Sequence, residues 1–404
     1  MVAEKSDGYA VISIAIITAL VAIVLGWLWT RDPDEIPTIN SYPGDFSLKR
    51  AHKEYLLNSR NLIKDGVKRF DGPFRVITAL GSRVILPASY TEWVKGCLDL
   101  DHQALVHHEY FGGYPGMEGI GMVTDPRKIT IDVAKKKLNQ SSQCKVMQEH
   151  IKESLKEAWD DSKDWHVVDW PQNAVSFIAR MSSAWLRDAA AGRSLDHTAA
   201  QLAFAVSALH TTTELLKQTL LDICTHPKLI QPIRDEVSEA LKEDGWTTAG
   251  LFKMQLLDSV IKESQRLKPG LLVNLERKAL CDVTLANGMK LPKGTNLAVD
   301  SSMMWDPTIY PNPTVYDGYR FLRLRQSGNG TAALVSTSRE HIAFGIGKPI
   351  CPGRFFAANE LKVALANILM NYDVKIAGDR EPKIIEIGFE MLSNPEASLM
   401  VKRR

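Results

Sequence analysis

The chain has 404 residues, 45% hydrophobic and 24% charged, a composition typical of globular proteins and not of disordered or collagen-like chains. Its 49 lysine and arginine residues against 47 aspartate and glutamate residues leave a formal charge of +2, which argues against a nucleic-acid-binding protein. Five cysteines are few, odd in number and without zinc-module spacing, so a reducing compartment fits best.

The first predicted element is a transmembrane helix at residues 9–30, after a short N-terminal segment at residues 1–8. This run has no charged side chain and, as a helix, would span about 33 Å, which is enough to cross a bilayer. A cleaved signal peptide is the alternative, but the apolar stretch is longer than a usual signal-peptide core and no small-x-small site precedes Arg31. We therefore expect a signal anchor. Basic residues between Lys49 and Arg60 favour a cytosolic main body.

Residues 31–45 are expected to form a hinge between the anchor and a folded body. Pro37, Pro43 and Gly44 punctuate this segment and interrupt any helix. The hinge would let the body that follows orient itself at the membrane surface.

The body, residues 46–404, shows mostly helical periodicity and no repeat. Two segments carry hairpin signals: residues 74–86, broken at Gly81, and residues 283–291, around the Asn-Gly turn at Asn287. The sequence thus predicts a mainly α domain with small β-sheets.

The most informative segment is a glycine-rich loop, residues 344–354, in which Cys351 comes just before a helical pattern. Gly345, Gly347 and Gly353 would allow positive φ angles and let the backbone approach a flat ligand closely. The helix start would stabilise a thiolate through its free N–H groups and dipole. A lone cysteine is most often a small buried hydrophobic residue, but this loop favours a metal ligand at Cys351.

These residues closely resemble the haem-binding loop of the cytochrome P-450 superfamily, whose pattern is Phe-Gly-x-Gly-x-(Arg/His)-x-Cys-x-Gly. The continuation from Cys351 to Ala357 is particularly similar to fungal, microsomal-type members. The resemblance implies a cytochrome P-450-like fold, haem b as the cofactor and Cys351 as the iron ligand. The cofactor-binding residues that it implies are Phe344, Gly345, Gly347 and Gly353. Pro349 departs from the pattern, because it stands where the family usually has an Arg or His that contacts a haem propionate.

The resemblance also implies a structural network of Glu263, Arg266 and Arg320. The family carries Glu-x-x-Arg on a helix, which fits Glu263 and Arg266 here, and a later Arg, which fits Arg320. Alone, an i,i+3 pair is usually a surface salt bridge, but the order of the surrounding segments supports the network. Its expected role is to lock the cysteine loop against the helical core.

A long helix is expected at residues 198–225, with Asp196 as its cap and Pro227 as its terminator. In the family, such a helix crosses the distal face of the haem and carries a small residue, an acid and a threonine. Thr211 would fill the hydroxyl position, with Thr212 following, and His210 replaces the acid. The resemblance implies catalytic roles for these three residues. The alternative is that they only face a neighbouring helix.

Two further basic positions are weaker candidates for contacting haem propionates. Arg277 resembles the propionate-binding position that follows the Glu-x-x-Arg helix in the family. Lys135, Lys136 and Lys137 fit a second such position, but a solvated basic face is the simpler interpretation of three adjacent lysines.

The chain resembles an internally shortened family member. Two helices that ordinarily roof the substrate site are expected between Trp185 and His197, but only a short segment is present there. An open distal pocket would let water reach the iron, so we expect poor coupling and peroxide formation. Residues 110–122 are the alternative cover.

The resemblance implies a haem-thiolate monooxygenase of the endoplasmic reticulum membrane, with electrons from NADPH through NADPH–cytochrome P-450 reductase. By analogy with fungal members, the expected substrate is a lipophilic small molecule of secondary metabolism, such as a terpenoid. Two alternatives stay open. One is a haem-thiolate isomerase or dehydratase that works without dioxygen, and the other is a catalytically impaired, membrane-anchored remnant.

Overall fold

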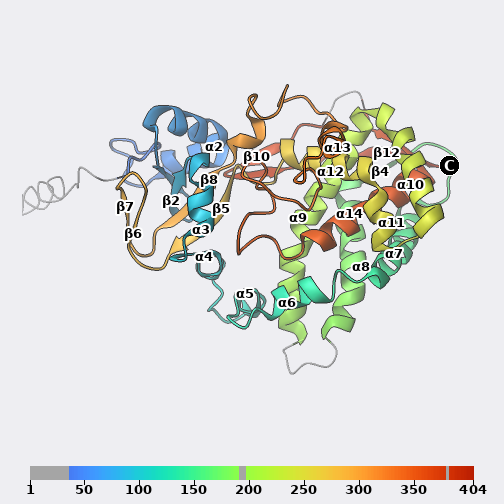
Figure 1. Cartoon of the computed structure of the whole chain (residues 1–404), viewed down its shortest axis with the longest axis horizontal. Coiled ribbons are helices and arrows are strands. Elements are labelled where there is room, and N and C mark those ends of the chain that lie inside the picture. Colours follow the sequence, from blue (N-terminus) through green and yellow to red (C-terminus); the bar gives the residue numbers. More distant parts are fainter. Residues whose placement is uncertain (1–35, 191–196, 379–381) are drawn as a thin grey trace, which may run out of the picture.

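The computed structural model describes residues 36–190, 197–378 and 382–404. Within these ranges the chain is mainly helical, with short strands in small sheets (Figure 1). No helix in these ranges is both long and apolar enough to cross a bilayer. The transmembrane helix predicted at residues 9–30 lies outside the described residues, as do the segment before it and the start of the predicted hinge.

Helices make up about half of the described chain. The α-helices are α2 (Lys49–Phe70), α3 (Thr91–Gly96), α4 (His102–Glu109), α5 (Glu118–Val123), α6 (Ile129–Lys136), α7 (Ser141–Trp159), α8 (Trp170–Ala190), α9 (His197–Thr225), α10 (Ile230–Asp244), α11 (Thr248–Lys253), α12 (Gln255–Leu267), α13 (Arg320–Gln326) and α14 (Arg354–Asn371). Short 3-10 turns are η1 (Ala88–Tyr90), η2 (Pro227–Leu229) and η3 (Ser302–Trp305). The long helix predicted at residues 198–225 is confirmed as α9, which ends before Pro227 as expected from the missing proline N–H.

The strands are short. They are β1 (Phe74–Thr78), β2 (Gly81–Leu86), β3 (Leu100–Asp101), β4 (His166–Val168), β5 (Val273–Ala279), β6 (Val283–Thr284), β7 (Lys290–Leu291), β8 (Asn296–Asp300), β9 (Tyr372–Ile376), β10 (Ile385–Ile387), β11 (Glu390–Leu392) and β12 (Leu399–Arg403). In the described chain the largest sheet has the order β1-β2-β8-β5-β3, a second has the order β4-β12-β9, and two hairpins complete the set. Both predicted hairpins are confirmed, as the antiparallel pairs β1-β2 and β6-β7.

The largest sheet is buried on both faces because its side chains alternate between two hydrophobic clusters. On β2, Val84 and Leu86 pack in one cluster, while Ile85 between them packs in the other. On β8, Leu297 and Val299 likewise point away from Ala298. The sheet, α2 and α3 gather at one side of the molecule, away from the helical part (Figure 1).

The helical part is built around the largest core, which is formed mainly by α7 to α14. Its centre is aromatic: Trp159 lies 5.3 Å from the ring of Tyr372 and 5.7 Å from that of Phe177, both edge to face. Helix α9 runs through this part and contacts α8, α12 and α14 (Figure 1). It thereby joins the elements that carry the predicted site residues.

The end of the predicted hinge, residues 36–40, packs along β1. The Ile39 N–H donates to the Arg75 carbonyl oxygen at 3.0 Å, and the Arg75 N–H donates to Pro37 at 2.7 Å. Asn40 is fully buried and its amide donates to the Ile77 carbonyl oxygen at 2.9 Å. These residues therefore belong to the folded body.

Candidate functional site

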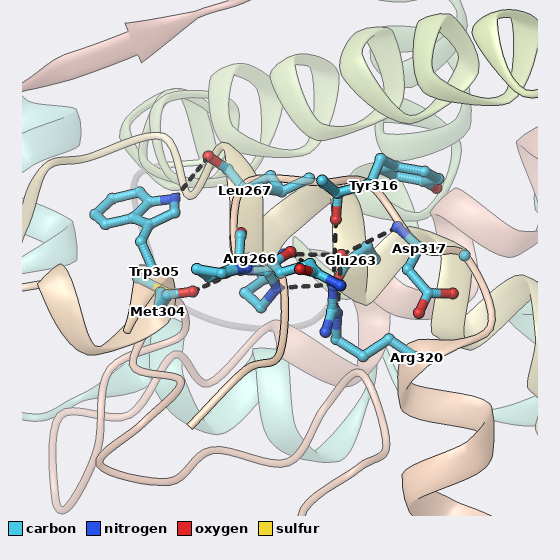
Figure 2. A network of polar contacts seen from close by, with 12 residues as sticks. Glu263, Arg266, Leu267, Met304, Trp305, Tyr316, Asp317 and Arg320 are labelled. Carbon is cyan, nitrogen blue, oxygen red and sulfur yellow. Dashed lines mark hydrogen bonds and ion pairs between the residues drawn. The ribbon is translucent and has the colours of Figure 1, made fainter. Parts of the chain in front are cut away.

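The structure brings Glu263, Arg266 and Arg320 together in one buried ion-pair network (Figure 2). The Arg266 guanidinium donates to both Glu263 carboxylate oxygens at 2.8 Å, within one turn of α12. Arg320, at the start of α13, donates through Nε to the same two oxygens, at 3.0 and 3.1 Å. No side chain of the three is more than 8% exposed, so both guanidinium groups meet the one carboxylate away from water.

The same network fixes the backbone between η3 and α13. Arg266 Nη1 donates to the carbonyl oxygens of Met304, at 2.6 Å, and Pro313, at 2.7 Å. The Asp317 N–H donates to Glu263 at 3.2 Å (Figure 2). Buried carbonyl groups outside helices and sheets need such donors, so the network holds this irregular segment against α12.

Cys351 lies in a closed loop directly before α14. Its N–H donates to the Phe344 carbonyl oxygen at 2.8 Å. Gly345 and Gly347 have φ angles of 73° and 79°, in the left-handed region that the sequence predicted for them. A Cβ at Gly347 would also lie 2.8 Å from the side chain of Lys95 on α3. Glycine is thus required there by both conformation and space.

Gly353 differs from the prediction. Its φ is −87°, so the expected positive φ is wrong there, because this residue is the N-cap of α14 and enters the helix with ordinary backbone angles. A Cβ at this position would meet no atom within 4 Å. The backbone beside Cys351 is therefore open to close approach by a flat ligand, which was the other part of the expectation.

The thiol of Cys351 is free, and opposing effects act on its charge. Burial raises the pKa of this thiol, while the N–H groups of Gly353 and Arg354 and the guanidinium charge of Arg354 lower it. Burial is the largest effect, so the pKa lies above its ordinary value in the protein alone. Metal coordination removes the proton from such a sulfur, and the N–H groups are in place to stabilise the resulting thiolate.

Arg277, on β5, carries a buried charge that has no carboxylate within ion-pair distance in the part of the chain that the structure describes. It is 4% exposed, and its guanidinium donates to the Glu276 backbone carbonyl oxygen at 2.7 Å. The Glu276 carboxylate is instead paired with Arg83. Desolvation lowers the pKa of Arg277 to about 10, although Asp101 and Glu276 oppose this at longer range. A buried cation in this state fits an anionic ligand group, such as a haem propionate.

His210, Thr211 and Thr212 lie in the middle of α9 but have different surroundings. His210 and Thr211 are exposed, whereas Thr212 is 4% exposed. Thr211 therefore presents its hydroxyl outside the packed core and Thr212 does not. Leu209, beside His210, and Phe344, from the cysteine loop, both pack against the largest hydrophobic core, so both parts of the predicted site border that core.

The three lysines at the end of α6 are all exposed. Lys136 pairs with Asp132 at 3.2 Å in an i,i+4 arrangement on the helix surface. The structure thus favours the solvated face over a propionate contact for this group.

Comparison with known proteins decides the family. The family model for Cytochrome P450 matches residues 124–403. The chain belongs to the cytochrome P450 family. This P450 is similar to cytochrome P450 monooxygenase adrA of Penicillium rubens, with 31% identity over 92% of this chain and 92% of that protein. It is also similar to cytochrome P450 monooxygenase ntnM of a Nectria species, with 30% identity over 98% and 93% of the two chains.

A solved structure supports the fold of this P450. The crystal structure of the cytochrome P450DA heme domain superimposes with a TM-score of 0.68 and 15% identity, and the match covers 91% of this chain and 97% of that one. The predicted P450-like fold is therefore confirmed. Family membership implies a haem iron bound through a cysteine thiolate, and the Cys351 loop, the open backbone at Gly353 and the unpaired Arg277 fit such a group.

The same comparisons show that this P450 lacks internal residues. In the match to the Penicillium protein, 92% of 404 residues, about 372, are spread over 471 positions, so about 99 positions have no residue from this chain. Because the match spans 92% of both proteins, most of these positions are internal. In the structure, only residues 191–196 separate α8 from α9. This connection is too short to contain two roof helices.

Helix α5 packs directly on the first half of α9. A Cβ at Gly119 would lie 2.9 Å from the Leu202 side chain and 3.2 Å from the Ala203 backbone nitrogen, so only glycine permits this close crossing. The segment named from sequence as an alternative cover, residues 110–122, therefore does contact the helix expected at the distal face. Its aromatic residues Tyr110, Phe111 and Tyr114 remain more than half exposed.

Arg354 is a site residue that the sequence reasoning missed. Its guanidinium donates to the carbonyl oxygen of Cys351 at 3.0 Å and to that of Val335 at 3.2 Å. It also lies over the ring of Phe355 at 4.5 Å. A basic residue at the first helical position after the cysteine was the available signal, since such a side chain is unfavourable for the helix dipole and needs another reason to be there.

We expect replacement of Arg277 by methionine to have opposite effects on haem binding and on the haem-free protein. Loss of a charge-assisted contact should weaken haem binding by about tenfold or more, measured as the rate of haem transfer to an acceptor protein. Removal of an unpaired buried charge should raise the denaturant midpoint of the haem-free protein. Lys278→Met, at the next and less buried position, is the control. Unchanged haem loss in Arg277→Met would contradict the assignment.

Proposed function

We propose that this P450 binds haem b through Cys351 and acts as a monooxygenase on a lipophilic small molecule. The observation that carries the proposal is the free Cys351 thiol in its closed loop at the start of α14, beside an open backbone. Similarity to fungal cytochrome P450 monooxygenases over more than nine tenths of the chain supports the reaction class. A secondary metabolite such as a terpenoid is the proposed substrate class, by analogy with fungal members.

Each residue of the site has a distinct proposed role. The haem, when bound, supplies the iron at which dioxygen is activated. Cys351 would hold the iron through its sulfur, which as a thiolate is an electron-rich ligand. Arg277 neutralises one propionate, and Phe344, Gly345, Gly347 and Gly353 shape the loop that the haem approaches. The network of Glu263, Arg266 and Arg320 is structural and does not contact the reacting atoms.

Proton delivery is assigned to α9. Thr211, an exposed residue of α9, would hold a water molecule through its hydroxyl and relay protons into the haem site, with His210 beside it in the sequence. Thr212 is buried and is left with a packing role.

Electrons, partner and location form the remaining part of the proposal. We assign the electrons to NADPH, delivered one at a time by NADPH–cytochrome P-450 reductase. The apolar run at residues 9–30 supports anchoring in the endoplasmic reticulum membrane, with the catalytic body in the cytosol. Such anchoring would bring lipophilic substrates near the site.

Reconstitution of the full chain with the reductase tests this function. The reduced protein should give the thiolate-type carbon monoxide spectrum, and NADPH consumption should yield an oxygenated product from a terpenoid panel, together with peroxide released from an open site. Substrate conversion that needs neither NADPH nor dioxygen would indicate the isomerase or dehydratase alternative. Absence of haem binding would indicate the inactive remnant.

Replacing Thr211 by alanine should divert electrons into peroxide. Without the hydroxyl, Thr211 could no longer hold the relay water, so we expect the peroxide formed per NADPH to rise severalfold while the carbon monoxide spectrum stays the same. Thr219→Ala, whose buried hydroxyl donates to the Leu215 carbonyl oxygen on the same helix, is the matched control. An equal ratio of peroxide to NADPH in the two variants would refute the role of Thr211.

A further inference from the structure

Residues 331–336, here called the tethered loop, are held by charged side chains from two helices. The loop contains no helix or strand. Lys262 of α12 donates to three of its carbonyl oxygens: Thr331 and Ala333 at 2.7 Å and Ser336 at 2.9 Å. One hydrogen bond within the loop runs from the Ser336 N–H to the Ala333 carbonyl oxygen at 3.0 Å, and Lys262 adds three donors of the kind that a regular element would otherwise supply to its carbonyl groups.

Lys262 is completely buried, and all three N–H bonds of its ammonium group are used. Burial lowers the pKa of Lys262 to about 7, with the charge of Asp258 opposing this. The three carbonyl oxygens favour the charged form. The loop and the ammonium group therefore depend on each other.

Lys262 is not needed as a counter-charge for Asp258. Asp258 lies one turn earlier on α12, forms an ion pair with Lys362, and accepts the N–H of Leu334 at 2.7 Å. Two residues of α12 thus bind the tethered loop. Lys262 donates to its carbonyl groups, and Asp258 accepts one of its N–H groups. The geometry indicates that Lys262 serves to bind the tethered loop and not to balance the charge of Asp258.

The tethered loop is linked directly to the cysteine. Arg354, the first residue of α14, donates to Val335 in the loop at 3.2 Å and to the Cys351 carbonyl oxygen at 3.0 Å. Between Val335 and Cys351 the chain passes through His341, which is 2% exposed and packs edge to face on the ring of Phe321 at 5.7 Å. A shift of the loop would therefore move the partner of Arg354 and, through it, the backbone at Cys351.

We propose that Lys262 is a positioning residue for the iron ligand: it fixes the tethered loop so that Arg354 sets the backbone at Cys351. The inference rests on the proposed haem site. Lys262 thereby forms a second connection from α12 to the chain that precedes the cysteine. The first is made by the next residue, Glu263, which holds the segment between η3 and α13. Adjacent side chains on one helix thus fix two segments that precede the cysteine.

The test compares Lys262→Met with Lys268→Met in the full-length, haem-loaded protein. Lys268 follows the same helix, and its ammonium group pairs with Asp222 at 2.7 Å, away from the loop. In Lys262→Met, loss of three charged hydrogen bonds should raise amide exchange in residues 331–336 by about tenfold or more. The fraction of haem with the thiolate-type carbon monoxide spectrum should fall severalfold. Lys268→Met should change neither quantity.

If Lys262→Met does not fold, Lys262→Arg tests the same positioning role. Arginine keeps the charge, but its planar guanidinium cannot meet three acceptors arranged around one nitrogen, so exchange in the loop should still rise and the thiolate fraction should still fall. Unchanged exchange and an unchanged thiolate fraction in the folded variant would overturn the proposal, as would equal losses in Lys262→Met and Lys268→Met. If the parent protein binds no haem, the proposed function fails, and amide exchange still reports whether Lys262 holds the loop.

Discussion

Replacement of Cys351 by alanine should abolish the thiolate-type carbon monoxide spectrum completely. The sulfur is the only feature of the closed loop that can bind iron through a thiolate, and the N–H groups of Gly353 and Arg354 stabilise that charge. Haem content should also fall, because the iron loses its protein ligand. The measurement is the reduced, carbon monoxide-bound spectrum of the purified protein, normalised to haem content.

The control for this experiment is Cys281→Ala. Cys281 is also a free cysteine, but it is exposed and lies in no glycine-rich loop. Its replacement should leave both spectrum and haem content unchanged. Persistence of the thiolate-type spectrum in Cys351→Ala, or its loss in Cys281→Ala, would mean that the ligand has been assigned to the wrong cysteine.

Replacement of Arg320 by alanine should destabilise the fold by about 3–5 kcal/mol, because the buried Glu263 carboxylate loses one of its two guanidinium donors in a network where each partner is fully desolvated. Arg320 also donates to the Pro311 carbonyl oxygen at 2.8 Å, so a backbone acceptor loses its donor at the same time. We expect a large drop in the denaturant midpoint and little haem-loaded protein. The carbon monoxide spectrum of the fraction that does load should keep its thiolate type.

Arg323→Ala is the matched control on the same helix. Arg323 forms an ion pair with Asp317 but is 59% exposed, so its loss should lower the stability by only about 0–1 kcal/mol. A fully stable, haem-loaded Arg320→Ala with a selective loss of turnover would show that the network acts in catalysis and not in folding.

The elements that sequence predicted well are those set by short-range effects. The Asn-Gly turn at Asn287 predicts the hairpin β6-β7 because its backbone preferences are local. Pro227 ends α9 for an equally local reason. The prediction failed at Gly353, where glycine is present without a positive φ, because residue type alone does not distinguish conformational need from a need for open space.

The burial and pairing of the charged side chains in the site could not be predicted from the sequence alone. Glu263 and Arg266 are three residues apart and fit the Glu-x-x-Arg pattern that the family resemblance implies, yet such spacing by itself usually marks a surface pair. Burial of both side chains to 0% exposure is what makes the pair structural. Arg277 shows the same limit, since its lack of a carboxylate partner depends on Arg83, far away in sequence, which takes the Glu276 carboxylate.

The sequence by itself determined the family and the order of the elements around Cys351, the proposed ligand, because a glycine loop, a cysteine and a helix start lie within a few consecutive residues. Only the tertiary structure decided which charges are paired. Lys262 meets carbonyl groups 69 to 74 residues away, and Arg320 meets a carboxylate 57 residues away. Such partners are chosen by burial, where an unsatisfied charge or carbonyl group is costly. Burial depends on how distant segments pack and not on local pattern.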